Sequence, residues 1–192
     1  MMDKKLGYLF FLLILIVKVE GSSGIRIIAG GRYDDMRMCV GSDAGVKGGP
    51  IADIMYIRRF EFKSEKNLVL EIPVMRPILF GTAFKMLQFE PAVSVPFIRP
   101  INSRKSLVIA PSIGLSFHYG PDYKADLDNR KRDFFALGPY MGAVFGVKVS
   151  QNSGKPNVYG LRLFYTPLFS SESNLSPGTV LGLALDFSHW LQ

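Results

Sequence analysis

The chain has 192 residues, a formal net charge of +7 and a hydrophobic content of 48%. This length predicts a single domain, and the lone cysteine, Cys39, excludes an intramolecular disulfide. The basic charge is not accompanied by any nucleic-acid-binding motif, so nucleic acid is not an expected partner. One cysteine and two distant histidines do not supply a metal site, and no glycine-rich phosphate motif predicts a cofactor.

The N-terminal segment is typical of an export signal. Two lysines precede an apolar run over residues 6–17, and side chains of small or moderate size lead to a possible cleavage site at Gly21. The run is shorter than the roughly 20 apolar residues that span a bilayer, which favours a signal peptide over a transmembrane anchor. We therefore predict a signal peptide over residues 1–21 and a mature domain over residues 22–192.

The rest of the chain consists of short alternating stretches separated by glycine, proline and polar residues, which predicts an all-β fold. Prolines within these stretches each remove a hydrogen-bond donor, so they are expected to mark strand ends or bulges. No segment after the signal is long and apolar enough to cross a bilayer as a helix, so membrane insertion would require a closed barrel. The predicted strands, eight in all, are Ile25–Tyr33, Ile51–Lys63, Leu68–Phe80, Ala83–Arg99, Leu107–Tyr119, Phe135–Val149, Val158–Phe169 and Val180–Leu191.

The alternation is clearest from Leu107 to Tyr119, where odd-numbered residues are mostly bulky and even-numbered residues are mostly small or polar. One apolar face paired with a small or polar face is the pattern of a transmembrane β-barrel strand. A soluble barrel would turn its small residues to water, where lysine, glutamate and threonine are usual. The alternation therefore predicts bulky side chains toward lipid and small ones toward a tight lumen.

Most connections between the predicted strands alternate in length. Those near residues 64–66, 101–105 and 151–156 are short, whereas three of the four on the other side, over residues 34–50, 121–132 and 170–178, are long. The fourth, over residues 81–82, is short. Short turns on the periplasmic side and longer loops on the outer side are typical of bacterial outer-membrane barrels. An even strand count also places both termini on the periplasmic side.

Charged residues of both signs fall on the proposed inner faces, as a closed lumen network requires. Aromatic residues near strand ends are expected to form interfacial girdles. The proposed lumen charges are Asp53, Arg59, Glu61, Glu71, Glu90, Lys148, Arg162 and Asp186. The proposed girdle residues are Tyr119, Tyr159, Tyr165, Phe169, Phe187 and Trp190.

On these patterns the mature chain resembles the small, eight-stranded outer-membrane β-barrel proteins of Gram-negative bacteria. The stretch from Val180 to Trp190 is similar to their last strand, which ends in an aromatic residue. It departs from that pattern because Leu191 and Gln192 follow Trp190, and because Trp190 is in phase with the small face. The resemblance implies a closed up-and-down barrel in the outer membrane, contact with lipid and lipopolysaccharide, recognition by the barrel-assembly machinery, and a monomeric state.

The leading functional hypothesis is a structural or surface-interaction role without enzymatic activity. One alternative is a hydrolase or acyltransferase that modifies lipid or lipopolysaccharide, with His118 and Ser116 as candidate catalytic residues beside an acid such as Asp122 or Asp186. No nucleophile motif surrounds this pair, which favours a polar lumen lining instead. A second alternative is a soluble periplasmic barrel that binds an apolar ligand. A channel is disfavoured, because eight strands leave little lumen.

Overall fold

The computed structural model describes residues 21–34, 48–61, 67–75, 87–121, 133–150, 156–171 and 177–191. The predicted signal peptide and Cys39 lie outside these residues, apart from Gly21. Within them, no helix is long and apolar enough to cross a membrane. The strands are β1 (Ser23–Asp34), β2 (Gly49–Glu61), β3 (Asn67–Met75), β4 (Leu87–Phe89), β5 (Ala92–Ser94), β6 (Phe97–Pro100), β7 (Lys105–Pro121), β8 (Asp133–Ser150), β9 (Pro156–Ser170) and β10 (Gly178–Trp190).

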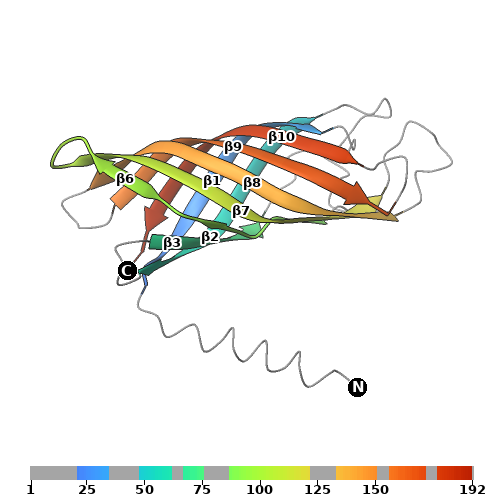
Figure 1. Ribbon diagram of the computed structural model, residues 1–192, viewed down its shortest axis with the longest axis horizontal. Helices are drawn as coiled ribbons and strands as arrows, with labels where there is room; N and C mark the ends of the chain where they lie inside the picture. Colours follow the sequence, from blue (N-terminus) through green and yellow to red (C-terminus); the bar gives the residue numbers. More distant parts are fainter. Residues whose placement is uncertain are drawn as a thin grey trace, which may run out of the picture.

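Antiparallel pairing closes these strands into a barrel (Figure 1). The pairs run from β1 through β2, β3 and β5 to β7, and in the other direction from β1 through β10, β9 and β8 to β7. β4, β5 and β6 all pair with β7 in one continuous register, so together they occupy a single strand position in the wall. The barrel is therefore eight-stranded, which confirms the predicted fold class.

Prolines account for the places where the predicted strands are irregular. The strand predicted over Ala83–Arg99 is divided by Pro91 and Pro96, neither of which can donate a backbone hydrogen bond. A bulge was the other expected effect of proline, and it occurs in β3, where the register with β2 shifts just beyond Pro73. The end of the predicted strand Leu68–Phe80 lies outside the described residues after Met75.

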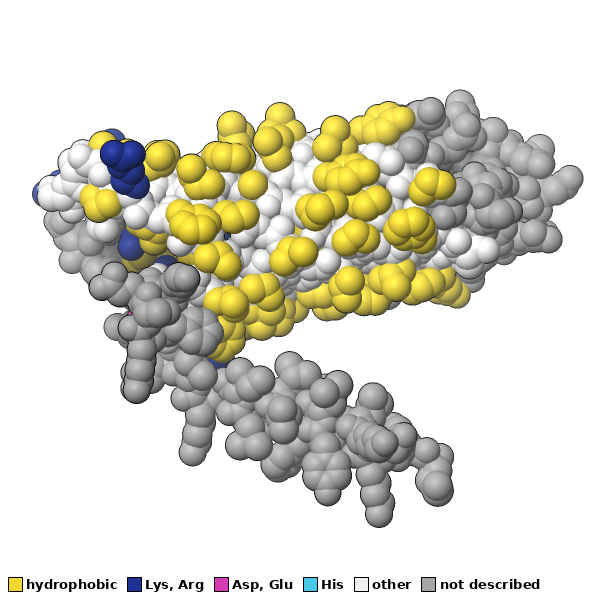
Figure 2. Space-filling model, in the orientation of Figure 1, with side chains coloured by type: hydrophobic (Ala, Val, Ile, Leu, Met, Phe, Trp, Pro, Cys, Tyr) yellow, Lys and Arg dark blue, Asp and Glu magenta, His cyan; other side chains and the backbone are white. Residues whose placement is uncertain are grey.

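The side chains face as the alternation predicts. On β7 the bulky residues point outward, and Ile113 is 65% exposed, whereas Ser112, Ser116 and His118 are buried inside. Apolar side chains cover the visible flank of the barrel between its two ends (Figure 2). An exterior of this composition and a polar interior invert the usual arrangement of a soluble protein, and match that of a membrane-spanning barrel.

One predicted girdle residue is wrongly placed. Trp190 is only 5% exposed and packs inside the barrel with Ile57 and Val69. Its position at the end of β10 follows the phase of the small face, and this phase decides the direction of the side chain. Tyr159 and Phe169, by contrast, point outward as expected of a girdle.

Candidate functional site

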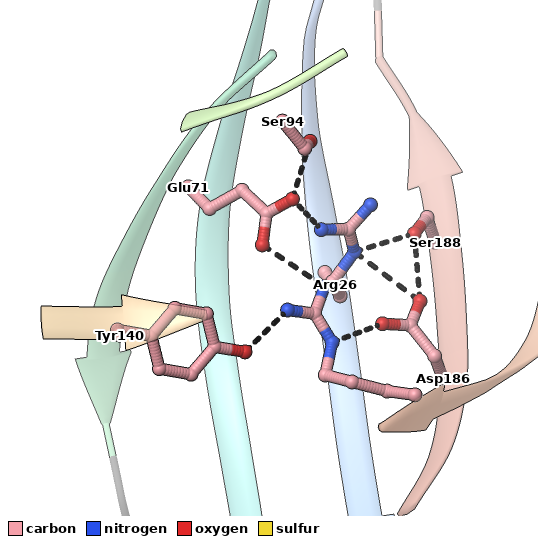
Figure 3. Close-up of polar contacts among 7 residues, drawn as sticks. Arg26, Glu71, Ser94, Tyr140, Asp186 and Ser188 are labelled. Carbon is pink, nitrogen blue, oxygen red and sulfur yellow. Dashed lines mark hydrogen bonds and ion pairs between the residues drawn. The ribbon is translucent and has the colours of Figure 1, made fainter. Parts of the chain in front are cut away.

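An ionic network lies in the centre of the lumen (Figure 3). The Arg162 guanidinium donates from Nε to Asp186 Oδ2 at 2.8 Å and from Nη2 to Glu71 Oε2 at 2.9 Å. Its Nη1 donates to the Tyr140 hydroxyl at 2.9 Å. Arg162 is almost fully buried, so these charge-assisted hydrogen bonds replace the water that the guanidinium loses on folding.

A second arginine completes the network. Arg26 Nη1 lies 2.5 Å from Glu71 Oε1, and Arg26 Nε lies 3.2 Å from Asp186 Oδ1. Arg26 Nε also donates to Ser188 Oγ at 2.9 Å, and Ser94 Oγ donates to Glu71 Oε1 at 2.6 Å. Each carboxylate therefore contacts both guanidinium groups, one through each of its oxygens.

The network is electrically balanced, with two positive and two negative groups. Removing a single charge from water to a protein interior is costly, and pairing with good geometry offsets that cost. The members come from β1, β3, β5, β8, β9 and β10, so the contacts cross the lumen and tie distant parts of the wall together. The buried side chains of the network occupy the lumen at this level.

Small residues in the wall make room for these long side chains. Arg162 lies opposite Ala184 in the β9–β10 pair, and Arg26 lies opposite Ser188 in the β1–β10 pair. A Cβ atom at Gly142 would stand only 2.9 Å from the Tyr140 hydroxyl oxygen. The alternation of small and large inner residues thus positions the arginines and the tyrosine without crowding.

A second polar cluster contains the candidate catalytic pair. Ser116 Oγ lies 2.6 Å from His118 Nε2 and donates to Glu90 Oε1 at 2.7 Å. His118 Nδ1 lies 2.8 Å from Gln88 Nε2. In a catalytic triad the carboxylate holds Nδ1 while Nε2 receives the serine proton. Here the Glu90 carboxylate lies on the Nε2 side and itself accepts the hydrogen bond from the Ser116 hydroxyl, which differs from that arrangement.

The eight predicted lumen charges lie in four places. Glu71, Arg162 and Asp186 meet in the central network, and Glu90 joins His118. Asp53 is buried elsewhere in the lumen, where it lines a small cavity between the two clusters. Three others lie near the end of the barrel that carries the termini. There Arg59 is half-buried with its guanidinium 4.1 Å from the Trp190 ring, Lys148 is half-buried, and Glu61 is largely exposed, 3.8 Å from Arg59.

Arg26, Tyr140, Ser94 and Ser188 were not predicted as members of the network. Arg26 carried a usable signal, because it alternates with the outward-facing Ile25 and Ile27. The pairing of Arg26 with Glu71 and Asp186, however, depends on barrel closure, which no local pattern reveals.

A small cavity separates the two polar clusters. Asp53, Glu90, Tyr140 and Arg162 line it together with apolar side chains, and about 10 Å³ is open to the centre of a water molecule. This volume is room for roughly one water, far below the several hundred Å³ of a typical ligand pocket.

A closed, eight-stranded antiparallel barrel with an apolar exterior and a charged, filled lumen defines a membrane-spanning β-barrel of the outer-membrane type. The crystal structure of Neisserial surface protein A (NspA) is similar to it, with a TM-score of 0.57 and 8% sequence identity over 88% of this chain and 98% of that chain. The likeness to NspA confirms the fold.

Two structures of Ail, the attachment invasion locus protein of Yersinia pestis, are also similar. The first has a TM-score of 0.45 and 15% identity over 90% of this chain and 100% of that chain. The second, a complex with the heparin analogue sucrose octasulfate, has a TM-score of 0.44 and 16% identity over the same shares. No protein-family model and no curated protein matches the chain.

Proposed function

We propose that this protein is an outer-membrane β-barrel with a closed lumen and a structural or surface-interaction role. The observation that carries the proposal is the inverted distribution of side chains. Leucines on β10 such as Leu185, at 66% exposure, point away from the barrel, whereas Arg162 and Glu71 are buried within it. Lipid solvates the outward-facing leucines, and pairing within the lumen network compensates the buried charges.

The alternative of a soluble barrel that binds an apolar ligand requires the opposite orientation. Its outer surface would carry polar side chains, and its interior an apolar cavity of several hundred Å³. The exposed leucines of β10 and the charged, nearly filled cavity next to Arg162 both argue against this alternative.

The surface for partners, in this proposal, is the end of the barrel opposite the termini. Strand ends such as Asp34, Pro121 and Asp133 lie at that end, where the longest predicted connections join them. The central network supports a role in holding the barrel rigid rather than in passing solutes. Liposomes that contain the barrel are therefore expected to take up a monosaccharide no faster than empty liposomes.

Cell fractionation tests the location. We expect the protein in the detergent-insoluble outer-membrane fraction, with a shift in gel migration between unheated and boiled samples because the closed barrel resists unfolding. Recovery as a soluble periplasmic protein would contradict the proposal. A variant with Leu183 and Leu185 replaced by lysine is a matched control, since both residues point outward and the change should impair insertion.

We further propose that the protein has no catalytic activity and that His118 and Ser116 line the lumen. Both side chains are completely buried, and the Glu90 carboxylate holds the Ser116 proton away from His118. Expression of wild-type protein and of a His118→Ala variant should leave identical mass spectra of lipid A and phospholipid. A mass change that depends on His118 would favour the lipid-modifying alternative.

Assembly by the barrel-assembly machinery belongs to the same proposal. β10 offers an alternating apolar strand, although its aromatic residue, Trp190, is turned into the lumen and is followed by the exposed Leu191. Deletion of Leu191 and Gln192 should therefore leave outer-membrane yield unchanged, whereas removal of β10 should abolish it.

A further inference from the structure

The β6–β7 hairpin, residues 97–105, lies at the end of the barrel where β1 begins and β10 ends (Figure 1). It carries exposed basic and apolar side chains. Arg99, Arg104 and Lys105 are exposed, and so are Phe97 at 62% and Ile101 at 60%. Figure 2 shows basic side chains gathered at this end. The sequence from residue 91 to residue 121 contains no aspartate or glutamate, so the hairpin carries positive charge alone.

The tip of the hairpin is held in a defined conformation. The Asn102 side chain accepts hydrogen bonds from the backbone N–H groups of Arg104 at 2.9 Å and Lys105 at 2.8 Å. The Lys105 carbonyl accepts from the Ile101 N–H at 2.9 Å, and Ser150 N–H of β8 donates to the Arg104 carbonyl at 2.9 Å. These bonds fix the backbone from which the basic side chains project.

The basic residues continue directly from the apolar exterior. Along the outer face of β7, Ile109 and Leu107 are followed by Lys105, and Arg99 lies opposite Leu107 in the pair with β6. Lysine and arginine at such a boundary can keep their stems on apolar surface while the charge reaches the headgroup layer. The outer face of β7 therefore passes from residues suited to lipid tails to residues suited to lipid phosphates within a few positions.

Among the residues that the structure describes, β6 pairs with β7 alone, and its other edge is a poor site for another strand. In this part of the chain the backbone N–H groups of odd-numbered residues point toward β7, as the hydrogen bond from Val95 N–H to the Pro111 carbonyl shows. The backbone N–H and C=O groups of residues 96, 98 and 100 therefore point to the other edge of β6. Two of these three are Pro96 and Pro100, which have no N–H to donate. Proline on an edge strand blocks strand addition, so a peptide that extends the sheet is not the occupant.

We propose that the β6–β7 hairpin binds the phosphate groups of anionic phospholipids in the leaflet on the terminus side of the membrane. This inference rests on the proposed function, because it requires the barrel to span a bilayer. Three basic side chains without a neighbouring acid in the segment, next to exposed Phe97 and Ile101, match a surface that is negatively charged outside and apolar beneath.

The test compares lipid selectivity in bilayers. The mature chain is reconstituted in vesicles with spin-labelled phosphatidylglycerol or phosphatidylcholine, and the boundary population of each is measured by electron paramagnetic resonance. We expect about three-fold selectivity for phosphatidylglycerol, falling toward one in 1 M salt because screening is strong there. The variant Arg99→Gln/Arg104→Gln/Lys105→Gln should lose the selectivity while flotation with the vesicles stays unchanged.

The matched control is Arg130→Gln/Lys131→Gln/Arg132→Gln, which removes the same charge from the connection between Pro121 and Asp133. It should retain the selectivity. Equal loss in both variants, or no loss in the hairpin variant, would overturn the inference while flotation still supports the proposed function. Spin-labelled lipid A serves as a third probe. The inference would also be overturned if the hairpin variant lost its selectivity for lipid A but kept its selectivity for phosphatidylglycerol. A wild-type chain that does not float with vesicles would refute both proposals.

Discussion

Replacement of Arg162 is the sharpest test of the central network. Its guanidinium makes hydrogen bonds of 2.8, 2.9 and 2.9 Å to Asp186, Glu71 and the Tyr140 hydroxyl. Arg162→Met keeps most of the side-chain volume but leaves Arg26 alone with two buried carboxylates. Loss of one partner from a buried ionic group costs about 3–5 kcal/mol, so the equilibrium constant for unfolding should rise by roughly a thousand-fold.

A second substitution separates the cost of unpaired charge from the cost of lost packing. Arg162→Met together with Asp186→Asn restores a neutral network, because Arg26 then faces Glu71 as its only carboxylate among the four charged members. We expect the double variant to be more stable than Arg162→Met alone, with a coupling energy of about 2 kcal/mol.

The assay is urea unfolding in lipid vesicles, followed by the fluorescence of Trp190. This residue is the single tryptophan of the chain and is buried against Ile57 and Val69. Ser103→Ala at the exposed tip of the β6–β7 hairpin is the control and should change stability by less than about 0.5 kcal/mol. The reasoning fails if Arg162→Met stays within about 1 kcal/mol of wild type, or if the two substitutions are additive.

Other substitutions test the wall, the outer surface and the terminus end. Gly138→Ala should lower the free energy of unfolding by about 2 kcal/mol or more, because the added Cβ would overlap a β9 carbonyl. Gly31→Ala should lower it several-fold less, because the nearest atom to the added Cβ is 3.9 Å away, and urea unfolding distinguishes the two. Leu183→Arg places a charge on the outer face of β10 and should cost about 2–4 kcal/mol in vesicles but far less in detergent. Arg59→Gln removes the cation 4.1 Å above the Trp190 ring and should shift its emission spectrum with a stability loss of about 1 kcal/mol; an unchanged spectrum would contradict that contact.

The strands and their facing were predictable because both follow from a two-residue period that is written locally. In β7, the alternation of Ile113 and Leu115 with Ser112 and Ser116 is sufficient to assign inside and outside once lipid is recognised as the solvent. Trp190 shows that position in the alternation decides the direction of a side chain more than residue type does. The prediction of an interfacial aromatic was wrong, because Trp190 shares the phase of the small face and points into the lumen.

The composition of the network was less predictable, because its pairs join residues far apart in the chain. Arg26 and Ser188 are separated by 162 positions, and the shear of the barrel decides which inner residues share a level. The effect of proline was predictable in kind but not in place. Pro73 accompanies a bulge, whereas Pro91 and Pro96 divide a strand without changing its register with β7.

The seam between β1 and β10 has a consequence for how the chain reaches its native state. Eleven residue pairs, from Gly24↔Trp190 to Asp34↔Val180, join the first strand to the last. No short hairpin can nucleate this seam, so one edge of β1 stays unpaired until β10 is available to pair with it. Contacts of such high sequence separation form slowly, and an open strand edge invites aggregation. We therefore expect the open edge of β1 to need protection until β10 pairs with it, and truncation within β10 to leave the chain unable to close the barrel.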